Sequence, residues 1–208
     1  VNDMLNFALS DDAVNKLQTR SGKPADYFPT SNFYINVDKQ HIINSRLVPQ
    51  KYNDKIVDTM KWKVKDYALA KSHVVLLNII AENNWERPLY FSAAPGVDEY
   101  MGLDEFMFLE GLSYRLLPVK HNIFDDETTN INTEILFENL VDKFHWESLK
   151  NTDVYLDETN IRNTYVIKNA FLRLSSALIN EGKMNDAVKA IDKCFEIMPL
   201  SRVAADYY

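Results

Sequence analysis

The segment Asn-Asn-Trp-Glu-Arg-Pro-Leu-Tyr-Phe at residues 83–91 holds the side chains best suited to bind a ligand. Trp85 and Tyr90 offer flat apolar rings with one polar edge, which suits a sugar ring or a peptide. Arg87 adds a planar fork of hydrogen-bond donors. We therefore take Trp85, Arg87 and Tyr90 as candidate ligand-binding residues.

The same segment also has a structural interpretation, and we favour it because aromatic side chains are more often buried than used for binding. It predicts a loop between a helix and a strand, with Trp85 covering the core. Arg87 would then bind a carboxylate or a backbone carbonyl.

No complete catalytic pattern is found. The five glycines are too widely spaced for a phosphate-binding loop, and no two histidines stand four residues apart as helix-borne metal ligands do. The only cysteine, Cys194, can form neither an internal disulfide nor a zinc site without several other ligands. The sequence therefore predicts no catalytic residue, no metal site and no cofactor.

One charged pair depends on a bend in the backbone. Glu110 and Arg115 are an odd number of residues apart, so a regular strand would place them on opposite faces. They can pair only if the chain bends at Gly111.

Alternating apolar residues predict strands at 33–37 and 60–65, and a third strand, buried, at 88–92. Helical spacing predicts a helix at about 68–83. Strand, helix and strand then have the length of a parallel crossover unit.

Four other segments complete the first part of the chain. A short helix is predicted at 3–9, a strand at about 112–116 that Pro118 either ends or places at a sheet edge, and an amphipathic helix at 133–144. Residues 38–55 are polar and contain Pro49, so no element is predicted there.

From Asp157, a plausible helix N-cap, the chain is helical. The pattern is typical of a tetratricopeptide repeat, in which small residues let two helices approach and a glycine permits the turn. The matching residues are Phe171, Leu174, Ser175, Leu178, Gly182, Ala187, Ile191, Cys194 and Pro199. The predicted fold class is α+β: a mixed α/β domain with a small sheet at 1–156, then an all-helical tetratricopeptide-like hairpin at 157–208. The helical pattern still runs at Tyr208, so we expect it to continue beyond.

Composition limits the partners. The formal net charge is -7 and the lysines are dispersed, so we expect no nucleic acid partner. The longest strongly apolar stretch, residues 74–81, is far shorter than the roughly 20 residues that cross a bilayer.

Several motifs resemble a bacterial family of multi-spanning membrane proteins related to protein O-mannosyltransferases. This family is grouped as glycosyltransferase family 117 and was formerly a domain of unknown function. The similar runs are Asn-Asn-Trp-x-Arg-Pro-x-Tyr-Phe at 83–91, Leu-Glu-Gly-Leu-x-Tyr-Arg-Leu-x-Pro at 109–118, Tyr-Phe-Pro-Thr at 27–30 and Tyr-Leu-Asp-Glu at 155–158.

The resemblance covers only the family's C-terminal tail, so none of its catalytic residues can be placed on this chain. It implies a non-catalytic accessory domain on the extracytoplasmic (periplasmic) side of the bacterial inner membrane. The implied partners are a membrane-spanning N-terminal region, absent from this sequence, and an acceptor protein or glycan. The alternative is a tetratricopeptide-type protein interaction module of the cell envelope.

Overall fold

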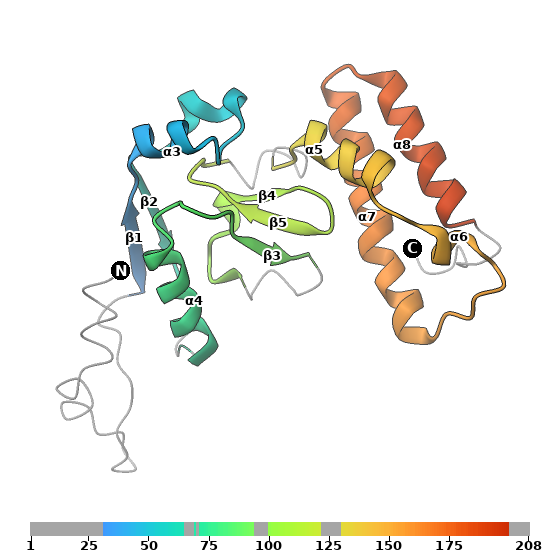
Figure 1. The fold of residues 1–208 in the computed structure, drawn as a ribbon, viewed down its shortest axis with the longest axis horizontal. Coiled ribbons are helices and arrows are strands. Elements are labelled where there is room, and N and C mark those ends of the chain that lie inside the picture. Colours follow the sequence, from blue (N-terminus) through green and yellow to red (C-terminus); the bar gives the residue numbers. More distant parts are fainter. Residues whose placement is uncertain (1–30, 65–68, 70, 94–99, 122–129, 200–208) are drawn as a thin grey trace, which may run out of the picture. The chain divides into compact units, whose positions relative to one another are not determined.

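The computed structural model describes residues 31–64, 69, 71–93, 100–121 and 130–199. It has the predicted α+β class, with two small antiparallel sheets, several helices and a C-terminal helical hairpin (Figure 1). The helix predicted at 3–9 lies outside the described residues. The domain boundary predicted between 156 and 157 stays a prediction.

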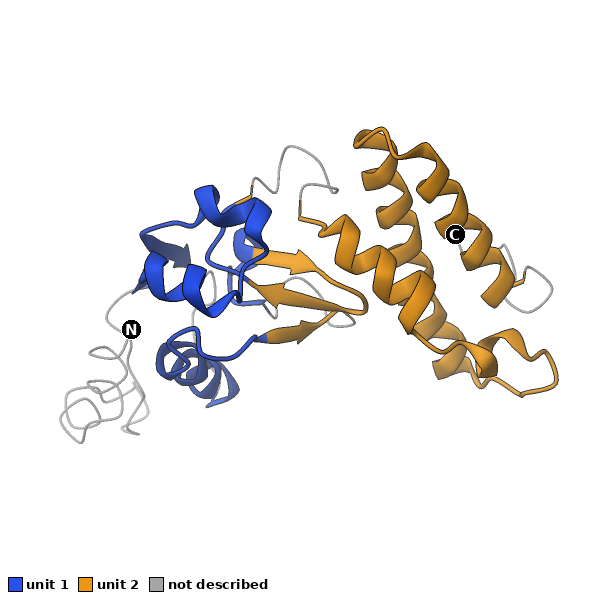
Figure 2. Cartoon of the chain, turned by 45° about the horizontal axis from the view of Figure 1, so that its top comes forward, with its two compact units in different colours: residues 1–89, 97–106, 117–120 blue, residues 90–96, 107–116, 121–208 orange. Residues whose placement is uncertain are grey.

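The chain divides into two compact units, drawn in different colours in Figure 2. The first contains residues 1–89, 97–106 and 117–120, and the second contains residues 90–96, 107–116 and 121–208.

A two-stranded antiparallel sheet belongs to the first unit. Strand β1 (Asn32–Asn36) pairs with β2 (Thr59–Lys63), so that Phe33 lies opposite Trp62. Both side chains are buried and their rings stack with centroids 5.8 Å apart. The alternation that predicted these strands therefore identifies the buried face correctly.

The helices of the first unit include one that sequence patterning missed. Helix α3 (Lys39–Ser45) starts where the Asp38 side chain accepts a hydrogen bond from the His41 backbone N–H, at 3.0 Å. It buries only Ile42, so its apolar periodicity is too weak to recognise. The 3-10 helix η1 (Gln50–Lys55) follows Pro49, and α4 (Lys71–Glu82) confirms the helix predicted at about 68–83.

The predicted parallel crossover is wrong. Strand β2 pairs with β1, and β3 (Tyr90–Ser92) pairs antiparallel with β5 (Ser113–Leu116) in a separate sheet of the second unit. The predicted burial of the strand at 88–92 is also wrong, since Tyr90 and Ser92 are exposed. Periodicity identifies strands, but a strand's partner depends on residues far along the chain.

The second sheet has the strand order β3-β5-β4, with all neighbours antiparallel. Strand β4 (Met107–Leu109) was not predicted because its three residues are all buried, which leaves no alternation to detect. Strand β5 was predicted, and it is the central strand of this sheet.

The helix predicted at 133–144 is present, with one local change. It begins as α5 (Thr133–Phe137) and continues as a π-helical turn, η4 (Glu138–Lys143). Leu136 and Leu140 are fully buried on its inner side. A short helix, α6 (Glu147–Lys150), follows.

The C-terminal hairpin consists of α7 (Glu158–Asn180) and α8 (Met184–Ile197), which lie side by side in Figure 1. The Asp157 side chain caps α7 as predicted, accepting a hydrogen bond from the Asn160 backbone N–H at 2.7 Å. Gly182 makes the turn at φ 75°. Phe171, Leu174, Leu178 and Ala187 belong to one buried core cluster.

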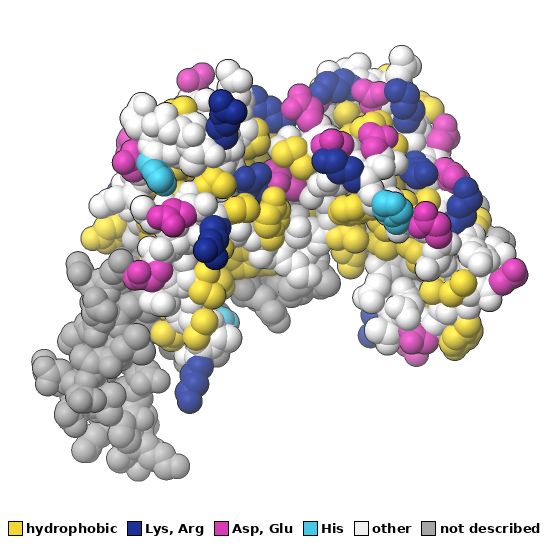
Figure 3. Space-filling model, viewed as in Figure 1, with side chains coloured by type: hydrophobic (Ala, Val, Ile, Leu, Met, Phe, Trp, Pro, Cys, Tyr) yellow, Lys and Arg dark blue, Asp and Glu magenta, His cyan; other side chains and the backbone are white. Residues whose placement is uncertain are grey.

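Among the described residues, none of the helices combines the length and the apolar character that a membrane-spanning helix needs. On the face seen in Figure 3, Lys and Arg side chains are interspersed with Asp and Glu over both units.

Candidate functional site

Two of the three predicted ligand-binding residues lie in the turn that follows α4, in the first unit. Asn84 and Trp85 have left-handed backbone conformations, at φ 43° and 58°. The Asn83 side-chain amide donates a hydrogen bond to the Arg87 carbonyl, at 2.8 Å, and closes the turn. Trp85 is partly buried and the Arg87 side chain is exposed. A ligand role for both residues remains a proposal.

The third predicted residue, Tyr90, opens strand β3 in the second unit. Its side chain is half-exposed, at 50%. Its hydroxyl donates a hydrogen bond to Glu110 Oε2, at 3.3 Å. Partial burial is the main cause that raises the pKa of this phenol, and the Arg115 guanidinium opposes that effect. Tyr90 therefore supports a buried carboxylate through its hydroxyl while half of the residue remains exposed.

That carboxylate is the centre of a polar cluster. The Glu110 side chain is only 2% exposed and lies 3.3 Å from Arg115 Nη1. Asn132 Nδ2 donates to Glu110 Oε1 at 3.2 Å, and Asn139 Nδ2 donates to the Glu110 carbonyl at 3.0 Å. These bonds satisfy a buried charge that would otherwise be costly. The cluster thus ties the sheet to the π-helical segment.

The Glu110–Arg115 pair confirms the bend predicted at Gly111. Gly111 has φ 120°, a conformation that residues with a Cβ rarely adopt. An added Cβ would also stand 3.1 Å from Phe144 Cζ. The glycine therefore lies in the turn between β4 and β5 that brings Glu110 and Arg115 together.

A cleft of about 430 Å³ lies between α7 and the β3-β5-β4 sheet. The sheet side contributes Ala93, Leu109 and Tyr114, and α7 contributes Tyr165, Val166, Lys168, Asn169, Ala170, Leu172 and Arg173. Small-molecule sites commonly have volumes of roughly 300–1,000 Å³. The cleft is large enough for one small ligand.

The spacing of the polar residues along α7 aligns them with the cleft. Tyr165, Asn169 and Leu172 are related as i, i+4 and i+7, so they share one helix face. Their side chains supply a phenol, an amide and an aliphatic group. This combination can contact both the hydroxyls and the carbon skeleton of a sugar.

Arg173 fixes the helix side of the cleft to the sheet side. Its Nη1 donates to the Tyr114 hydroxyl at 2.5 Å, and its Nη2 donates to Asn130 Oδ1 at 2.6 Å. The guanidinium carbon also lies 5.7 Å from the Tyr114 ring centroid, a distance suited to a cation–π contact. The wall is therefore built from contacts between distant parts of the chain.

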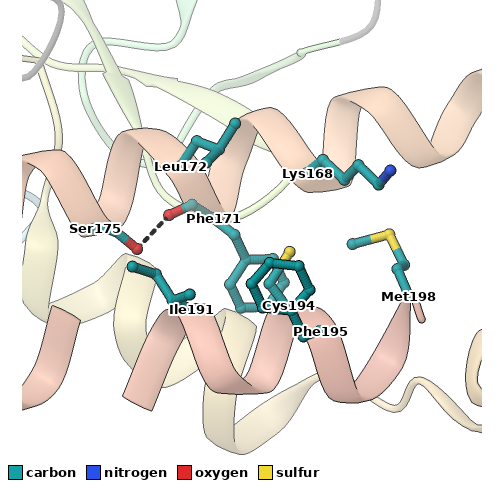
Figure 4. Close-up of a pocket in the computed structure, with 8 residues that line it drawn as sticks. All are labelled: Lys168, Phe171, Leu172, Ser175, Ile191, Cys194, Phe195 and Met198. Carbon is teal, nitrogen blue, oxygen red and sulfur yellow. Dashed lines mark hydrogen bonds between the residues drawn. The ribbon is translucent and has the colours of Figure 1, made fainter. Parts of the chain in front are cut away.

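A second, smaller hollow lies on the hairpin and differs in chemistry. It is a groove of about 70 Å³ between α7 and α8, lined mainly by apolar side chains (Figure 4). Phe171 and Met198 are buried beside it, whereas Leu172 and Phe195 are more than half exposed. Ile191 lines this groove as well and is only partly buried.

Cys194 also lines the groove as a free thiol. Burial raises the pKa of the Cys194 thiol, and the positive charge of Lys168 partly offsets that rise. A thiol with a raised pKa is a poor nucleophile near neutral pH. Within the described residues, no group of three or more His, Cys, Asp and Glu side chains is placed to hold a metal ion.

Sequence reasoning did not identify the cleft residues Tyr114, Tyr165, Asn169 and Arg173. They come from two segments some fifty positions apart, so no local spacing relates them. The signal that could have found Tyr165, Asn169 and Arg173 is a polar and aromatic stripe along a helix that otherwise needs apolar residues there.

A family model described as TMEM260-associated domain 2 matches residues 1–135, which include strands β1 to β5 and the start of α5. The sheet side of the cleft falls inside the matched region and α7 falls outside it. No curated protein and no solved structure matches the chain.

Proposed function

Because this chain belongs to the TMEM260-associated domain 2 family, we propose that it is an extracytoplasmic accessory domain of a membrane-bound, glycosyltransferase-like protein. In this proposal it binds the glycan or the glycan-bearing acceptor in the cleft between α7 and the β3-β5-β4 sheet. Sugar transfer takes place in another part of the full protein.

The observation that carries the proposal is the lining of the cleft. Two tyrosine rings, one asparagine amide and one arginine surround about 430 Å³. Sugar sites use aromatic faces for the apolar face of the ring and planar polar side chains for the hydroxyls. Enzymes that act on glycosidic bonds commonly use paired carboxylates, and among the described residues that line the cleft none is Asp, Glu or His. This composition favours binding over transfer.

A second candidate function is supported by the apolar groove on the hairpin. Leu172, Val188 and Phe195 are each at least 50% exposed, and Met184 is 56% exposed at the start of α8. On α8, residues 184, 188, 191 and 195 repeat at helical spacing and form one apolar stripe. Such a stripe suits a protein partner, as expected for a tetratricopeptide-like interaction module.

Sugar titrations followed by amide chemical shifts would test the main proposal. We expect members of a panel of mannose, glucose, galactose and their disaccharides to shift amide signals of residues that line the cleft. Asn169→Ala should weaken this binding because the amide no longer contacts sugar hydroxyls. Asn163→Ala, an exposed asparagine on the same helix, is the matched control.

Two outcomes would reject the proposal. One is that no sugar in the panel shifts the cleft signals. The other is that Asn169→Ala and Asn163→Ala bind sugar equally well. If peptides shift signals of the α7–α8 groove instead, and Phe195→Ala removes that effect, the interaction-module function is the better one.

A further inference from the structure

The Arg173 side chain on α7 reaches two parts of the sheet side of the cleft at once. Its Nη1 donates to the Tyr114 hydroxyl at 2.5 Å, and its Nη2 donates to Asn130 Oδ1 at 2.6 Å. Tyr114 itself lines the cleft. The Asn130 carbonyl accepts a hydrogen bond from the backbone N–H of Leu109, at 2.8 Å, and Leu109 also lines the cleft. One side chain of the helix therefore holds two segments of the opposite wall.

The same guanidinium restricts the direction of the Tyr114 ring. Tyr114 is only partly buried, so packing alone does not hold it in one rotamer. The Arg173 guanidinium carbon lies 5.7 Å from the ring centroid, and the hydroxyl at the far end of the ring accepts from the same group. A change of the χ1 rotamer would swing the hydroxyl away and break that hydrogen bond. Arg173 thus stabilises the rotamer in which the ring lines the cleft.

The shape of the Arg173 side chain matters here, apart from its charge. The two bonds use different nitrogens of one rigid planar group. A lysine ammonium is a single centre on a flexible stem, so it does not reproduce this fork. Substitution by lysine therefore separates the geometry of position 173 from its charge.

We propose that Arg173 is a positioning residue for glycan binding, which orients the Tyr114 ring so that the ring can cover a sugar held in the cleft. An aromatic ring covers the apolar side of a sugar with its flat face, so the direction of the ring decides whether it can bind. The proposal rests on the glycan-binding function described above and deepens it, because the effect of Arg173 passes through Tyr114.

A double-mutant cycle tests the proposal. Glucose, mannose and galactose are each titrated into the full chain and followed by amide chemical shifts. Tyr114→Phe keeps the ring and removes only the hydroxyl that accepts from Arg173. We expect Tyr114→Phe and Arg173→Gln each to weaken binding roughly tenfold, as loss of one hydrogen bond allows. The double variant should bind as well as either single variant, because both changes break the same link.

Arg173→Lys should weaken binding as much as Arg173→Gln does, since the ammonium keeps the charge and loses the fork. Arg162→Gln is the matched control, because Arg162 lies on the same helix and is 73% exposed in an ion pair with Glu158. The χ1 rotamer of Tyr114, measured from NMR couplings, gives a readout that needs no sugar. It should become averaged in Arg173→Gln and stay single in Arg162→Gln.

The outcomes separate this proposal from the function on which it rests. If the losses of the two single variants add in the double variant, Arg173 contacts the sugar itself and the positioning role is wrong. Full affinity in Arg173→Lys, or an unchanged Tyr114 rotamer in Arg173→Gln, would also overturn it, and glycan binding would stand. If none of the sugars binds the unmodified chain, both proposals fail. If Arg173→Gln does not fold, Tyr114→Phe decides, and unchanged affinity in that variant rejects the positioning role.

Discussion

The cleft and the groove border the same helix, yet they have different contents. The cleft has about 430 Å³ and exposes phenol, amide, ammonium and guanidinium groups, whereas the groove has about 70 Å³ and is mostly apolar. Helix α7 contributes Tyr165, Asn169 and Arg173 to the cleft alone, and Phe171 and Ser175 to the groove alone. A volume the size of the groove takes single side chains of a partner, and only the cleft has room for a small ligand.

Lys168 and Leu172 line both hollows. Any occupant of the groove therefore contacts residues that also form the wall of the cleft. Substitutions at the cleft or at the groove can therefore test how the two hollows differ.

Among the substitutions at the two hollows, Phe171→Ala should have the largest effect on stability. Phe171 is 1% exposed and lines the groove, with its ring centroid 6.2 Å from that of Trp146. Truncating a buried phenylalanine costs about 3–5 kcal/mol and leaves a cavity. The free energy of unfolding, measured in urea, should fall by that amount.

Phe195→Ala is the control for this prediction. Phe195 lines the same groove but is 54% exposed. Its truncation should change stability by less than about 1 kcal/mol. Equal losses in the two variants would mean that the groove is covered by other protein atoms in solution.

Glu110→Gln should have the next largest effect on stability, because it changes a buried ion pair on the sheet side of the cleft. The change removes the charge that faces the buried Arg115 guanidinium and costs about 3 kcal/mol. Glu138→Gln removes an exposed ion pair with Lys143 and should cost less than about 1 kcal/mol. If urea unfolding shows no difference between these variants, the Glu110 cluster is not what holds the sheet.

The smallest expected effect is a shift in the pH dependence of alkylation at a single residue, Cys194. Burial disfavours the thiolate, so alkylation by iodoacetamide should follow a pH profile displaced above the ordinary thiol pKa of about 8.5. Lys168→Met should displace the profile further upward, because the cation that favours the thiolate is lost. A profile identical to that of the unfolded chain would show that the groove is open to solvent at this position.

The raised pKa of the Cys194 thiol also makes stability depend on pH. Above the ordinary thiol pKa the unfolded chain loses its proton while the folded chain keeps it. The unfolded state then binds fewer protons, so stability should fall as pH rises through that range.

Elements with strong patterns could be predicted from the sequence. The alternation of Met60 and Trp62 predicted β2 and its buried face, and the helical spacing near Leu77 predicted α4. Helix α3 could not be predicted because it buries one residue and depends on a cap at Asp38. The sheet topology could not be predicted either, since alternation does not indicate which strand is the partner.

The candidate site was harder still to predict, because a local sequence pattern does not indicate which distant residues come together. The Glu110–Arg115 pair was accessible to sequence reasoning because both residues belong to one segment with a glycine between them. The cleft was not, because Tyr114 and Arg173 meet only after the sheet and the hairpin have formed. The residues chosen from one segment, Trp85, Arg87 and Tyr90, are distributed over two units, and their role in binding stays a prediction.

The way the chain passes between the two units has a practical consequence for dissecting the protein. It changes unit at residues 89–90, 96–97, 106–107, 116–117 and 120–121. No single cut therefore yields both units as complete polypeptides. A fragment that starts at residue 121 keeps α5 to α8 but lacks all three strands of the second sheet, and with them the sheet side of the cleft. Deletion mapping with such a fragment would thus remove part of the cleft together with the first unit, whereas point substitutions can test one unit at a time.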